Sequence, residues 1–87
     1  QVTENIQYIL LLDHIAIFER STLVHWHNMF NLHKNNILPD SDWEELIWLI
    51  RFVCKRQATR EAWKIFKGNF GIPFQEFLEQ QFSIADN

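Results

Sequence analysis

The chain has 87 residues, of which 47% are hydrophobic, 15% aromatic and 22% charged, and its formal net charge is −3. This length forms one domain, and so apolar a composition excludes an intrinsically disordered protein. A single Cys excludes an internal disulfide, and the two Gly and two Pro residues leave most of the chain without a helix breaker. We therefore predict one all-α domain over residues 1–87.

The first segment, about residues 3–35, contains neither Gly nor Pro and predicts one long helix, or two helices joined near Ser21-Thr22. Its longest apolar run, IQYILLL, is shorter than the roughly 18 to 20 residues that span a bilayer. We expect a cytoplasmic protein, and an upstream membrane anchor stays possible. At 100° per residue one face of this helix collects Tyr8, Leu11, Leu12, Ile15, Leu23, Trp26, Met29 and Phe30.

Three shorter helices are predicted after Asn35-Asn36, where the first helix ends. Ser41 and Glu44 have the spacing of a capping box, which predicts a second helix from there to about residue 57. Thr59 is expected to cap a third helix that runs to about residue 67. Pro73 is expected to open a fourth, Phe-rich helix at its first position. The predicted fold is a small helical bundle of one long N-terminal helix packed with three shorter helices.

Glu19 is the most informative polar residue, because the helical wheel places it at the centre of the apolar face, between Ile15 and Leu23. A carboxylate there needs a partner, and we expect either a Trp indole N–H or an Arg. The other possibility is a catalytic acid, which would need a second titratable group. The residues one helical turn away supply none. Glu19 is therefore predicted to be a structural, buried polar residue.

Metal and thiol chemistry find little support in the sequence. His14, His25, His27 and His33 share no helical spacing of three or four residues, which two ligands on one helix face require. Cys54 lies on the predicted inner face of the second helix, where a small buried hydrophobe is expected. We predict no catalytic residue, no metal and no cofactor, and expect that the protein is not an enzyme.

An apolar stripe lies on the first helix opposite the core face. Leu10, Ile17 and Val24 recur every seven residues, with Ile6 beside them. A helix that is apolar on two sides is either buried in a larger core or shared with another chain, and a domain of this size can cover both sides only with difficulty. We predict a non-enzymatic protein that acts by association through this stripe, with itself as a homodimer or with another protein.

A basic segment gives the alternative prediction. Residues 51–67 contain six bases and one acid, and Arg56, Arg60 and Lys64 could contact an anion or nucleic acid. The simpler interpretation is a solvated helix face together with a helix C-terminus. Trp48 and Phe52 lie near this side, where they could stack on bases, make a cation–π contact or pack against another helix. The alternative function is therefore a nucleic-acid-associated regulator.

Four short motifs resemble those of a group of small bacterial helical proteins of unknown function. These motifs are Phe18-Glu19, NNILPDSDW, TREAW and PFQEFLEQQF, which together cover residues 18–82. The chain departs from that group at Arg20, where Asn is usual, and at Asn36-Ile37, where Gly-Leu is usual. The resemblance implies that Glu19, Trp43 and Trp63 mark one fold. It implies no catalytic residue and no cofactor, and an N-terminal membrane anchor in some members.

Overall fold

The computed structural model describes the backbone of residues 2–86 and the side chains of residues 17–86. The elements follow in the order α1 (Val2–Lys34), α2 (Asp40–Val53), α3 (Gln57–Phe66), the short 3-10 helix η1 (Lys67–Asn69) and α4 (Ile72–Ala85). No strand occurs among residues 2–86. The predicted all-α helical bundle is therefore confirmed.

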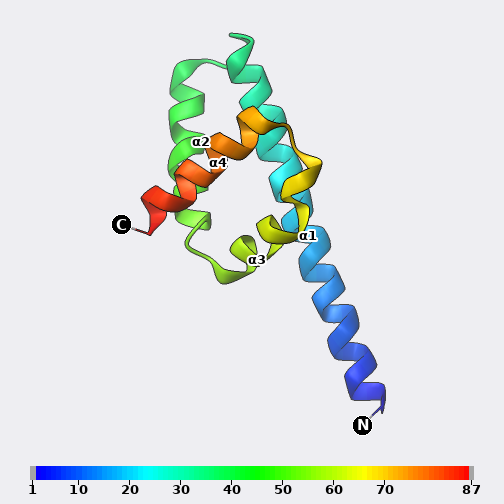
Figure 1. The fold of residues 1–87 in the computed structure, drawn as a ribbon. Coiled ribbons are helices and arrows are strands. Elements are labelled where there is room, and N and C mark those ends of the chain that lie inside the picture. The colour runs from blue at the N-terminus through cyan, green and yellow to red at the C-terminus, as the bar shows by residue number, and fades with distance from the viewer. Residues whose placement is uncertain (1, 87) are drawn as a thin grey trace.

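The helices pack around the C-terminal part of α1. That part contacts α3 and α2, while α4 lies against α2, and the ribbon of α1 continues toward the N-terminus past the other three helices (Figure 1). α1 runs through Ser21 and Thr22 without a break, and the Thr22 hydroxyl donates a hydrogen bond to the Phe18 carbonyl oxygen at 3.1 Å. Among the described residues, no helix combines the length and the apolar composition that crossing a membrane requires.

α1 ends where the Asn pair predicted it. Asn36 has a φ of 60°, the left-handed conformation that Asn tolerates better than most residues. The Ile37 N–H bonds to the Leu32 carbonyl at 2.9 Å, and the Asn36 N–H bonds to the His33 carbonyl at 3.0 Å. These are the two bonds of a Schellman motif, so the turn satisfies carbonyl groups that the end of the helix would otherwise leave free.

The predicted capping box of Ser41 and Glu44 is wrong. α2 begins at Asp40 after Pro39, whose backbone is extended with φ −58° and ψ 146°, and no side chain caps this end. The proline ring fixes φ, so the chain turns into the helix directly after Pro39, and Ser41 already lies inside the first turn. α2 also ends earlier than predicted, at Val53, with Cys54 in the capping position.

Two further helix starts differ from the predictions. α3 begins at Gln57 with Arg56 as its extended N-cap residue, so Thr59 lies inside the helix and does not cap it. Its hydroxyl is instead bonded to Glu19 of α1. Pro73 is the second residue of α4, after Ile72. It fits there because the first N–H groups of a helix have no partner within the helix.

The core is unusually aromatic. Phe74 is 1% exposed, and its ring centroid lies 5.0 Å from His27, 5.6 Å from Phe30 and 5.2 Å from Phe70. Offset and edge-to-face pairs of this kind contribute beyond their buried area. The buried hydrophobic residues are Leu23, Trp26, Trp43, Ile50, Cys54, Ala62, Trp63, Phe70, Phe74 and Leu78.

Candidate functional site

Glu19 lies in the core, where it joins α1 to the start of α3. The residue is 1% exposed, and its Oε2 accepts a hydrogen bond of 3.0 Å from the hydroxyl of Thr59, which is fully buried. The Arg56 guanidinium lies 3.0 Å from Oε1 as an ion pair, although Oε1 accepts no hydrogen bond among the described residues. Of the two partners that were expected for the Glu19 carboxylate, the structure shows the Arg and not a Trp indole N–H.

The surroundings of Glu19 suit a structural role better than catalysis. Thr59 and Arg56 hold both carboxylate oxygens, and half of the Arg56 side chain stays exposed. General acid–base catalysis would need a second titratable group within reach of the same substrate atom. Over the described residues, no three His, Cys, Asp or Glu side chains come close enough to hold a metal ion.

Cys54 is fully buried at the end of α2. Burial raises the pKa of its thiol to about 12 from the ordinary value of 9.0, and the positive charge of Arg60 opposes this only in part. Because the thiolate is the reactive form, Cys54 is inert at neutral pH in the folded protein.

This pKa predicts a loss of stability at high pH. Above pH 9 the unfolded thiol loses its proton while the folded thiol keeps it up to about pH 12, so rising pH favours the unfolded chain over this window. The free energy of unfolding should fall by at most about 1.4 kcal/mol per pH unit there. Urea titrations at several pH values check this. The Cys54→Ala variant should lack this contribution, and equal slopes in both proteins would contradict the account.

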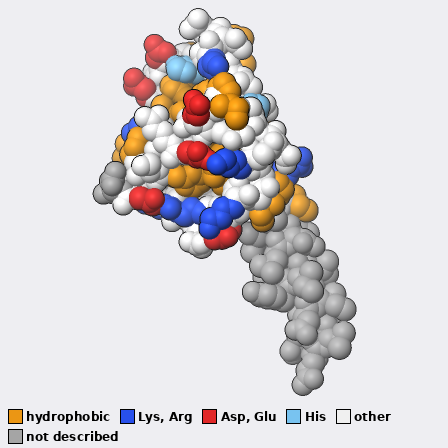
Figure 2. Space-filling model, in the orientation of Figure 1, with side chains coloured by type: hydrophobic (Ala, Val, Ile, Leu, Met, Phe, Trp, Pro, Cys, Tyr) orange, Lys and Arg blue, Asp and Glu red, His pale blue; other side chains and the backbone are white. Residues whose placement is uncertain are grey.

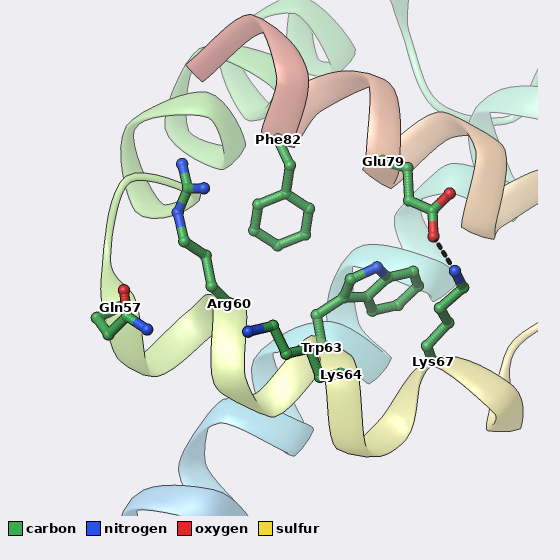
Figure 3. Close-up of a pocket in the computed structure, with 7 residues that line it drawn as sticks. All are labelled: Gln57, Arg60, Trp63, Lys64, Lys67, Glu79 and Phe82. Atoms are coloured by element: carbon green, nitrogen blue, oxygen red, sulfur yellow. Dashed lines mark ion pairs between the residues drawn. The ribbon is translucent and has the colours of Figure 1, made fainter. Parts of the chain in front are cut away.

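A cavity of about 440 Å³ lies between α3 and α4 and includes two of the predicted anion-binding residues. Figure 3 shows Trp63 at its base, Phe82 projecting from α4 above it, and Arg60, Lys64 and Lys67 around it. The Trp63 Nε1 atom is buried and has no hydrogen-bond partner among the described residues. The residues that line the cavity are Gln57, Arg60, Trp63, Lys64, Lys67, Glu79 and Phe82.

The cations of this cavity are already neutralised. Lys67 pairs with Glu79, Arg60 pairs with Asp86, and the Lys64 ammonium lies 3.4 Å from the Glu61 carboxylate. Figure 2 shows the band of basic side chains over α3 with acidic side chains among it. An anion would have to displace these carboxylates, which disfavours an anion site here.

Arg56 does not belong to the same group as Arg60 and Lys64. Its guanidinium is directed to Glu19, and the residue does not line the cavity. Only two of the three predicted anion contacts therefore line the cavity. Arg56 is the N-cap residue of α3, whereas Arg60 and Lys64 lie within the helix, and the Arg56 side chain extends to Glu19 of α1 and not to the cavity.

The stripe on α1 is described only in part. Ile17 is 64% exposed and Val24 39% exposed, whereas the side chains of Ile6 and Leu10 lie outside the described residues. Phe18, one position further round the helix, is 62% exposed. The described part of the stripe therefore faces away from Glu19 and stays uncovered in the single chain.

The exposure of the outer face of α2 differs most from what the sequence led us to expect. Trp48 is 75% exposed, Phe52 63% and Leu49 51%, so packing of Trp48 and Phe52 against another helix is contradicted. No cation–π contact involves either ring among the described residues. The sequence did place both rings off the core face. What it did not reveal is that no other part of the described chain covers them.

Comparisons with protein-family models, with curated proteins and with solved structures gave no match for this chain. The exposed apolar surfaces and the charges described above are therefore the features that bear on function.

Proposed function

We propose that this protein acts by protein association, as a homodimer that forms through the stripe on α1. The observation that carries the proposal is the exposure of Ile17 and Val24, at 64% and 39%, on the side of α1 opposite Glu19. Glu19, Leu23 and Trp26 are all buried on the other side, so α1 has its core contact and still presents apolar side chains to water. A second chain would remove them from water.

The course of α1 supports the same proposal. The other three helices flank only its C-terminal part, and its ribbon runs beyond them toward the N-terminus (Figure 1). The sequence of that N-terminal part contains Leu10, which continues the heptad spacing of Ile17 and Val24, and Ile6 beside it. A two-fold pairing of α1 with α1 of a second copy is the closed arrangement that such a surface favours.

The decisive variant changes Leu10, Ile17 and Val24 together to Gln, a residue that favours helices. At low micromolar concentration we expect the variant to be a folded monomer where the natural sequence is a dimer, because the apolar contact is lost. Light scattering coupled to size-exclusion chromatography measures the mass, and far-UV circular dichroism reports folding. A matched control changes the exposed Phe18 and Ile65 to Gln, which should leave the dimer intact. An unfolded triple variant, or a folded one that stays dimeric, would contradict the proposal.

A nucleic-acid-associated regulator stays the alternative prediction. The feature in its favour is that Arg60 and Lys64 line one cavity together with two aromatic rings. Against it, Arg60, Lys64 and Arg56 each have a carboxylate partner. Protein association is the function that the geometry supports better.

A further inference from the structure

The outer face of α2 comprises Glu44, Glu45, Trp48 and Phe52, together with Lys55 in the turn that directly follows the helix, and it is exposed and aromatic. Trp48 and Phe52 are 75% and 63% exposed and lie one helical turn apart. Large rings with this exposure are uncommon on a protein that works alone, and Trp is enriched at the centres of protein interfaces.

The charges on this face are separated along the helix. On the N-terminal side of Trp48 a hollow of about 500 Å³ is lined by Ser41, Glu44 and Glu45. On its C-terminal side a hollow of about 130 Å³ is lined by Arg51, Phe52 and Lys55. The face is therefore acidic at one end, aromatic in the middle and basic at the other end.

The end charges have no partner within the described part of the chain. None of the ion pairs there involves Glu44, Glu45 or Lys55. Arg51 differs, because its Nε donates a 2.8 Å hydrogen bond to the Gln81 side chain. Glu44, Glu45 and Lys55 are thus the charged groups of this face that remain available to a second molecule.

We propose that the outer face of α2 binds the same face of a second copy in antiparallel orientation. Glu45 and Lys55 have their midpoint at residue 50, and so do Trp48 and Phe52. A two-fold axis that passes beside α2, perpendicular to the helix and at the level of residue 50, therefore brings Glu45 opposite Lys55 of the second copy. The same axis brings Trp48 opposite Phe52 of the second copy. One symmetry operation thus pairs the opposite charges and also places the aromatic rings against one another.

The distribution of charge on this face favours a second copy of the chain as its partner, and disfavours a polyanion. A nucleic acid or an anionic lipid surface would meet Lys55 favourably, but Glu44 and Glu45 on the same face would repel it. The same acidic groups become favourable contacts when the partner's α2 runs in the reverse direction and places its Lys55, in the turn after that helix, opposite them. The face is therefore complementary to itself.

This contact goes beyond the proposed α1 dimer, because it uses a different helix and a different set of residues. The face is small, so we expect a weak contact that forms only at high protein concentration, as transient interfaces of small area do. Joined to the α1 contact, it would link dimers into larger assemblies. The two contacts can be tested separately.

Sedimentation equilibrium of the full chain at rising protein concentration tests this contact. The protein used is the variant in which Leu10, Ile17 and Val24 are changed to Gln, because it lacks the α1 contact. There we expect monomer at low concentration and dimer at high concentration. Glu45→Lys alone and Lys55→Glu alone should each weaken this association by roughly tenfold, since each places like charges opposite one another at two symmetric positions. The combined exchange E45K/K55E should restore it. Trp48→Ala should weaken it by about tenfold or more.

Controls separate this contact from general charge effects and from failure of the α1 proposal. Glu76→Lys makes the same change in net charge on the exposed side of α4 and should leave the association unchanged. If the triple variant does not fold, the α1 proposal fails, and the same substitutions are compared in the natural sequence, where they should weaken the association that appears only at high protein concentration. Association that the combined exchange does not restore, or that Glu45→Lys strengthens, would overturn the proposal.

Discussion

Phe74→Ala should lower the free energy of unfolding by about 3 to 5 kcal/mol, the largest loss expected from truncating any one side chain of this core. Phe74 is 1% exposed, and its ring contacts Phe30 of α1, Trp63 of α3 and Phe70 just before α4. The truncation leaves a cavity where these elements meet. A domain of this size has only about 5 to 10 kcal/mol in total, so the variant should be close to unfolding at physiological temperature.

Urea denaturation followed by Trp fluorescence measures this loss. Ile72→Ala is the matched control, because Ile72 lies on the same helix and is 61% exposed. We expect the control to change stability by no more than about 0.5 kcal/mol. Similar losses in both variants would show that Phe74 is not at the centre of the core.

The second large effect concerns the ion pair of Glu19. Arg56→Met should lower the free energy of unfolding by about 2 to 4 kcal/mol, because it leaves a buried carboxylate without its cation. The lower part of this range takes account of the exposure of half the Arg56 side chain. Thr59 would still donate its hydrogen bond but supplies no charge.

A double-mutant cycle isolates the electrostatic contribution. Glu19→Gln removes the charge and keeps an oxygen that can accept the hydrogen bond from Thr59. In that background Arg56→Met should cost about 1 kcal/mol or less, since no buried charge remains to be compensated. Equal costs of Arg56→Met in both backgrounds would mean that the guanidinium stabilises the fold by packing alone.

Local sequence signals predicted much of the fold. The lack of Gly and Pro before Asn35-Asn36 predicted a long helical segment, and the Asn pair predicted the turn, where Asn36 adopts its positive φ. The wheel that placed Glu19 among Leu23 and Trp26 did so from spacing alone, and all three are buried. These signals succeed because they concern contacts within one helix or one turn.

The errors arise where a local motif competes with another interaction. Ser41 and Glu44 had the spacing of a capping box, but α2 already begins at Asp40, directly after the extended backbone of Pro39. Thr59 was predicted to be a cap, whereas its hydroxyl donates to Glu19, which is distant in sequence. No spacing rule within a short segment can predict a bond between two helices.

Surface residues were the least predictable. The sequence showed that Trp48 and Phe52 lie off the core face, but whether a neighbouring helix covers them depends on how all the helices pack. The charges of α2 were explained by the helix dipole alone. The proposed pairing across a two-fold axis depends also on the exposure of the rings between these charges.

The solution mass of the natural sequence tests the central claim of association most directly. Size-exclusion chromatography with light scattering at low micromolar concentration, repeated over a range of salt concentrations, needs no assumption about a ligand. The account predicts twice the chain mass of 10.6 kDa, with little dependence on salt because the α1 stripe is apolar. A mass of 10.6 kDa at every salt concentration would contradict association through α1.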